Sequence, residues 1–175
     1  PVSWPSTQLS DWLITALPQG GKIGFDPWLH THSEIEKLRA DFAKTKIKLI
    51  ATDNLIDRIW HNQPSAPLDK MIPHALTYAG QDHAEKIANA ANELHDAGHT
   101  AFVLTQPDSI AWLTNTRGTD LGQTPVALAY AILYATGELS LVIDAQKTDA
   151  DLIAHLGADI TLEPSENFET VLATL

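Results

Sequence analysis

The sequence predicts an α/β fold in which a mixed β-sheet is flanked by helices, with the chain divided into two parts. Apolar residues recur at helical spacing in segments that alternate with short apolar runs typical of strands. A stretch with three prolines and no sustained apolar period, residues 63–77, is typical of a linker between domains. In the later part, Thr136-Gly137-Glu138 lies between two apolar runs, which predicts an antiparallel hairpin and therefore a mixed sheet.

The first part, residues 1–62, is predicted to follow the order helix, strand, helix, strand, helix. Gly20-Gly21 ends the first helix. Thr31 and Glu34 have the spacing of a capping box, which starts the second helix, and Asn54 starts the third. The predicted helices cover residues 6–17, the segment from 31 onward and residues 55–60, and the predicted strands cover residues 22–26 and 47–51.

The second part, residues 78–175, is predicted to contain a hairpin among alternating helices and strands. Asp82 and Glu85 have capping-box spacing, and Gly98 ends the helix that they start. Asp108 is predicted to cap a short helix, and Ser165 to open the last one. The predicted strands cover residues 101–105, 126–135, 139–144 and 160–162, and a helix begun by Thr148 and Asp151 ends at Gly157.

Composition excludes several classes of function. The 22 acidic and 11 basic residues give a net charge of -11, which argues against nucleic-acid binding because phosphates need a basic face. The absence of cysteine excludes disulfides, thiol nucleophiles and thiolate metal sites, and predicts a reducing cytoplasm. No apolar run approaches the roughly 20 residues of a membrane span, so no membrane partner is expected. The start without Met and the apolar stripe up to Leu175 suggest a piece of a longer protein.

Motifs with catalytic or metal-binding potential are weak. His30 and His32 have a spacing that two metal ligands use, but they flank a helix start, so a structural or solvent role is favoured. Gly20-Gly21-x-x-Gly24 precedes a strand rather than a helix, so it is not a phosphate loop. Ser109 lacks the Gly-x-Ser-x-Gly elbow of a hydrolase nucleophile. No catalytic residue and no metal ligand is therefore assigned within the chain.

The five tryptophans divide into two groups. Trp12, Trp60 and Trp112 lie on apolar helical faces and are predicted to belong to the core. Trp4 and Trp28 fall in less regular segments, where a partner is able to contact them.

The polar segment 114–124, TNTRGTDLGQT, is the candidate recognition loop. Asn115, Arg117 and Asp120 are its candidate site residues, and Gly118 and Gly122 give the backbone freedom. The alternative is a solvated loop in which Arg117 and Asp120 form a local ion pair worth little to stability. The residues alone leave both interpretations open.

Five stretches together resemble the non-catalytic part of the three-domain Xaa-Pro aminopeptidases, also called aminopeptidase P, of the pita-bread metallopeptidase family. These stretches follow the same order and similar spacing over essentially the whole chain, and they are GKIGFDPWLHT, NLIDRIW, PLDKMIPHALTYAGQDHAEKI, DSIAWLTNTRGTDLGQTPVALAYAIL and LVID.

The resemblance implies two creatinase N-terminal-like domains of ribonuclease-H-like α/β topology ahead of a catalytic domain. Residues 1–62 would be the C-terminal part of the first, 63–77 the Pro-rich linker and 78–175 the second, nearly complete. The catalytic domain, with an Asp, His and Glu cage for two divalent metal ions, usually manganese, would follow Leu175. Without it the chain is expected to be inactive and to bind no cofactor itself.

The parent enzyme would be a cytoplasmic hydrolase that removes the residue preceding proline from a peptide by two-metal hydrolysis. The implied partners of this chain are its own catalytic domain, short proline-containing peptides and a second copy in a homodimer. Asn115, Arg117 and Asp120 are expected at the substrate access or a domain interface. Two alternatives stay open: a free-standing creatinase N-like binding module without activity, and a small-molecule-binding α/β domain.

Overall fold

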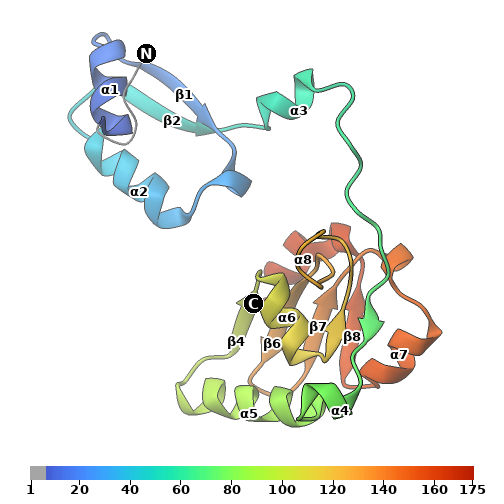
Figure 1. Cartoon of the computed structure of the whole chain (residues 1–175). Coiled ribbons are helices and arrows are strands. Elements are labelled where there is room, and N and C mark those ends of the chain that lie inside the picture. Colours follow the sequence, from blue (N-terminus) through green and yellow to red (C-terminus); the bar gives the residue numbers. More distant parts are fainter. Residues whose placement is uncertain (1–6) are drawn as a thin grey trace. The chain divides into compact units, whose positions relative to one another are not determined.

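A computed structural model describes residues 7–175 of the chain (Figure 1). Contacts divide the chain into two compact units, Pro1–Pro64 and Ser65–Leu175, which are described separately. Within the described residues, no helix is long and apolar enough to cross a membrane. Trp4 lies outside the described residues.

Unit 1 has the predicted order of helices and strands, and its elements are α1 (Leu9–Ala16), β1 (Gly21–Phe25), α2 (His32–Asp41), β2 (Ile47–Ala51) and α3 (Leu55–Ile59). Strands β1 and β2 pair in parallel, from Gly21 opposite Ile47 onward. The predicted capping box is confirmed, since Glu34 N donates to Thr31 Oγ1 and Thr31 N donates to Glu34 Oε2. These hydrogen bonds from Thr31 hold the pKa of Glu34 below its ordinary value.

Unit 2 is built on a four-stranded sheet in the order β4-β6-β7-β8 (Figure 1). Its strands are β4 (Ala101–Leu104), β6 (Tyr130–Tyr134), β7 (Leu139–Val142) and β8 (Ile160–Glu163). The pairs β4–β6 and β6–β7 are antiparallel, whereas β7 and β8 are parallel. The predicted α/β class and mixed sheet are therefore confirmed.

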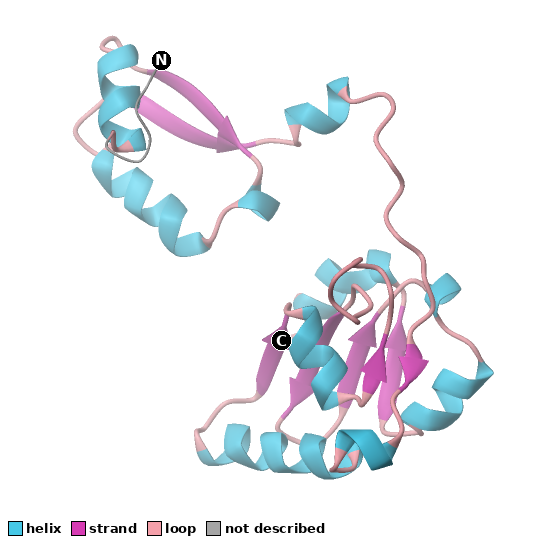
Figure 2. Cartoon of the chain, in the orientation of Figure 1, coloured by secondary structure: helices cyan, strands magenta, loops and turns pink. Residues whose placement is uncertain are grey.

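The helices of unit 2 are α4 (Leu76–Ala79), α5 (His83–Asp96), α6 (Pro107–Leu113), α7 (Ala150–Leu156) and α8 (Phe168–Leu172). Asp82 caps α5 as predicted, through a 2.8 Å bond from Ala84 N. A separate antiparallel pair joins β3 (Ile72–Pro73) to β5 (Thr116–Arg117). The segment between α3 and β3 forms a loop (Figure 2), yet Met71 at its end is only 1% exposed and belongs to the core cluster of unit 2.

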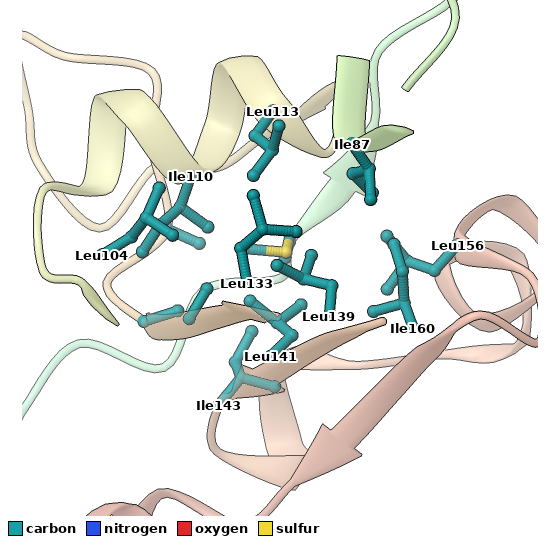
Figure 3. Close-up of a cluster of buried hydrophobic side chains, with 14 of the residues drawn as sticks. Ile87, Leu104, Ile110, Leu113, Leu133, Leu139, Leu141, Ile143, Leu156 and Ile160 are labelled. Atoms are coloured by element: carbon teal, nitrogen blue, oxygen red, sulfur yellow. The ribbon is translucent and has the colours of Figure 1, made fainter. Parts of the chain in front are cut away.

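The core of unit 2 lies between the sheet and helices α5, α6 and α7 (Figure 3). Its members come from each of these elements, and the fully buried ones include Ile110, Leu139, Leu141 and Leu152. Because α5 is strongly amphipathic, it turns Ile87 and Ala91 inward. This core fixes both ends of the segment that connects α6 to β6.

Some predicted features of unit 2 are wrong in position. With Asp108 as the predicted cap, helix α6 would start at Ser109. It starts two residues earlier, at Pro107, with Gln106 as its cap residue, because proline is preorganised for the first helical position. Strand β6 starts at Tyr130, not at residue 126. Val126 and Ala127 are buried, but they pack outside the sheet.

The prediction that Trp12, Trp60 and Trp112 are core residues is wrong, since they are 44%, 45% and 57% exposed. Helix α6 buries Ile110, Ala111 and Leu113 instead. One residue on from Ala111, the helix has turned by about 100°, which carries Trp112 away from the core.

Candidate functional site

The segment 114–124 has a left-handed residue at its second position, Asn115, whose φ is 49°. Asparagine tolerates this conformation better than most residues. Its side chain is almost fully buried: the amide nitrogen donates to Gln81 O at 2.8 Å, and Oδ1 accepts from Lys86 Nζ at 2.7 Å. Asn115 therefore ties the start of the segment to helix α5.

Lys86 is a buried cation, with 4% of its surface exposed. Its ammonium also donates to Trp112 O at 2.9 Å and lies 4.5 Å from the centroid of the Trp112 ring. Within residues 7–175, no carboxylate lies within ion-pair distance of it. Burial lowers the pKa of Lys86 below its ordinary value, and the nearby positive charge of Arg117 lowers it further, against a smaller opposing effect of Asp82.

Arg117 is half-buried on β5, where its backbone pairs with Ile72 of β3. Its guanidinium Nη1 donates to the carbonyl of Thr116 at 2.7 Å. Thr116 and Thr114 are themselves fully buried and share a 2.8 Å hydrogen bond between their hydroxyls. Arg117 thus directly follows a buried, hydrogen-bonded segment.

Asp120 is an anchor, and its side chain is fully buried. Oδ2 accepts from Lys147 Nζ and from Leu128 N, both at 2.6 Å, and Oδ1 accepts from Asp69 N at 3.2 Å. The local Arg117–Asp120 ion pair that the sequence left open does not form, because Lys147 takes the carboxylate. These bonds join three distant parts of unit 2 at one carboxyl group.

Gly118 is required by a close approach of two backbone segments. A Cβ at this position would lie 2.6 Å from Ala127 N and 2.8 Å from Ala127 Cβ. Gly118 N donates to Pro125 O. The loop is therefore folded tightly against the segment that leads into β6.

The other sequence candidates form no site. Among residues 7–175, no group of three or more His, Cys, Asp or Glu side chains is placed to hold a metal ion, and His30 with His32 and Glu34 is no exception. Ser109 Oγ contacts Gln106 Oε1 at 3.4 Å.

Sequence reasoning missed the two buried lysines. Lys86 precedes Ile87 on the inner face of α5, so a lysine beside an apolar stripe was the available signal. Lys147 offered no such signal, because its partner lies 27 residues away in sequence.

Comparison with known proteins identifies a family. Residues 62–175 match the model of the creatinase/prolidase N-terminal domain. Aminopeptidase P2 of Arabidopsis thaliana is 35% identical over 162 residues, which are 90% of this chain and 23% of that protein. A probable Xaa-Pro aminopeptidase P of Talaromyces stipitatus is 36% identical over 152 residues, or 85% of this chain and 23% of its own length.

The crystal structure of the X-prolyl aminopeptidase of Caenorhabditis elegans, a cytosolic enzyme with a di-nuclear active site, has a TM-score of 0.88 to this chain. The match covers 99% of this chain and 28% of that enzyme, at 25% identity. The chain spans about a quarter of the length of the relatives it matches. The resemblance expected from the five sequence stretches is confirmed, and the chain belongs to the creatinase/prolidase N-terminal domain family.

Proposed function

We propose that this chain is a non-catalytic part of an Xaa-Pro aminopeptidase, a metallopeptidase that removes the residue preceding proline from the N-terminus of a peptide. One observation carries the proposal: proteins of this name match 85% or more of the chain, and the matched region is only about a quarter of their own length. Proline lacks the amide hydrogen that many peptidases require, so such an enzyme needs a dedicated pocket.

The metal chemistry would lie outside the described residues. The di-nuclear active site of the C. elegans enzyme supports a parent protein with two metal ions, for which we propose manganese. Residues 7–175 do not fit such a centre, because no cluster of metal-ligating side chains is present among them. No step of the reaction is assigned to this chain. A cytoplasmic location is proposed from the cytosolic C. elegans enzyme.

The chain's own role would be to shape access to the active site. Segment 114–124 is held by Asn115 at one end and by Asp120 further along, and both side chains are buried. Arg117 between them is half-exposed. We propose that Asn115 and Asp120 position the segment and that Arg117 faces the catalytic domain or the peptide.

The domain organisation is part of the proposal. Residues 1–62 would form the C-terminal part of one creatinase N-like domain, and residues 78–175 would form most of a second. Residues 63–77 would be the linker between the two domains. We also propose that the parent enzyme forms a homodimer and that this region contributes contacts to it.

The complete reading frame tests the proposal first. A frame that continues past the codon for Leu175 into a region with Asp, His and Glu metal ligands is expected. The protein made from it should release the first residue of an Arg-Pro-Pro peptide, and a chelator should abolish the release. An immediate stop codon would favour the free-standing binding module instead.

A further inference from the structure

Among residues 7–175, neither of two cations of unit 2, Lys86 and Arg117, forms an ion pair with a carboxylate. Lys86 and Arg117 interact electrostatically, and the repulsion contributes to the lowered pKa of Lys86. Asn115, which Lys86 contacts, is a neutral amide. This is unexpected in a chain with 22 acidic and 11 basic residues, where carboxylates are plentiful.

The acidic groups nearby are already engaged. Asp120 is fully buried against Lys147. Asp82 caps α5 by accepting from Ala84 N, and it lies 3.8 Å from His83 Nδ1. Within residues 7–175, neither forms an ion pair with Arg117. Its guanidinium donates one hydrogen bond, from Nη1 to Thr116 O, so most of its five donors face solvent or an external ligand.

The surface beside Arg117 is apolar. Ile72, its partner in the β3–β5 pair, is 50% exposed. His74 continues from β3, is held by a 2.8 Å bond from its backbone nitrogen to Asn115 O, and lies 5.9 Å, ring to ring, from the exposed Tyr78. A ligand at Arg117 would therefore meet a cation next to the exposed apolar side chain of Ile72.

We propose that Arg117 is a binding residue for a peptide carboxylate, with the apolar part of the peptide lying over Ile72. Planar guanidinium groups bind carboxylates through two parallel hydrogen bonds, and a half-buried position strengthens the pair. The carboxylate is either the free C-terminus of a short peptide or an acidic side chain. The inference rests on the proposed function in one respect, that the ligand is a peptide.

The test uses the 175-residue chain, labelled with ¹⁵N and titrated with three probes: Gly-Pro-Leu as the free acid, Gly-Pro-Leu amide, and acetyl-aspartate amide. Saturable shifts of the Arg117 and Gly118 amide signals are expected with the free acid, and about tenfold weaker binding with the amide. Acetyl-aspartate amide tells whether a side-chain carboxylate is accepted: binding equal to the free acid assigns the site to acidic side chains as well, and weaker binding assigns it to the C-terminus.

Three variants complete the test. Arg117→Gln should weaken the free acid about tenfold and remove its preference over the amide. Arg117→Lys keeps the charge and should retain part of that preference. Arg58→Gln removes an exposed arginine of unit 1 and should leave the affinity for both the free acid and the amide unchanged. Equal binding of acid and amide, or no saturable shift with either carboxylate probe, would overturn the inference.

The outcomes are separable from those of the proposed function. If the chain binds carboxylates but the longer protein has no peptidase activity, the proposed function is contradicted and the carboxylate site at Arg117 is supported. If the longer protein is active but the chain does not bind carboxylates, the proposed function is supported and the site at Arg117 is contradicted.

Discussion

Replacing Asp120 by Ala should strongly destabilise unit 2. Asp120 is the meeting point of Lys147 Nζ, Leu128 N and Asp69 N, and none of its side-chain surface is exposed. Removing one partner of a buried ion pair leaves the other charge unpaired in a poorly solvated place, which costs about 3–5 kcal/mol. Lys147 keeps a single bond to Leu128 O at 3.0 Å, which is too little to offset that cost.

The measurement is urea unfolding of the whole chain, followed through amide signals of buried residues of unit 2 such as Ala131. The matched control is Asp96→Ala, because the side chain of Asp96 is 84% exposed and should change the free energy of unfolding by less than about 0.5 kcal/mol. The double variant Asp120→Ala/Lys147→Met should lose less stability than Asp120→Ala alone, since the unpaired charge of Lys147 is then removed as well. If Asp120→Ala were as mild as Asp96→Ala, the anchoring of the loop through Asp120 would be wrong.

Three further predictions concern the same unit. Gly118→Ala should lower the free energy of unfolding by about 1–3 kcal/mol, because a Cβ there meets a backbone nitrogen at 2.6 Å, whereas Gly122→Ala, with open space around it, should have little effect in the same urea titration. Met71→Ala should cost about 2–5 kcal/mol and lower the stability of unit 2 only; loss confined to unit 1 would contradict its place in this core. Arg117→Gln removes a repulsive charge and should raise the pKa of Lys86, measured from its side-chain carbon shifts during a pH titration, and an unchanged pKa would show that the two cations do not interact.

Features that depend on neighbours in sequence could be predicted. The capping box joins Thr31 to Glu34, three positions on, and the cap of α5 joins Asp82 to the backbone nitrogen of Ala84, two positions on. The predicted spacing of Asp82 and Glu85 gives this cap but no reciprocal capping box. The hairpin of β6 and β7 closes at Gly137, whose φ of 95° suits glycine. Each of these signals comes from groups that meet through local backbone geometry, so the residue types alone indicate the structure.

Features that depend on contacts between residues far apart in the sequence could not be predicted. Asp69 and Asp120 are 51 residues apart, and their hydrogen bond exists only because the segment before β3 packs on unit 2. The same limit applies to Trp112, which has an apolar neighbourhood in sequence but is 57% exposed, with its ring beside the ammonium of Lys86. The polarity of segment 114–124 indicated recognition, whereas only the structure separates the buried Asn115 and Asp120 from the half-exposed Arg117.

The most direct test of the whole account is hydrolysis of an Arg-Pro-Pro peptide by two samples measured side by side with Mn²⁺: the isolated 175-residue chain and the product of the complete reading frame. The account predicts release of the N-terminal residue by the longer protein only, and loss of that release with a chelator. Chelator-sensitive turnover by the isolated chain, or no turnover by the longer protein, would contradict it.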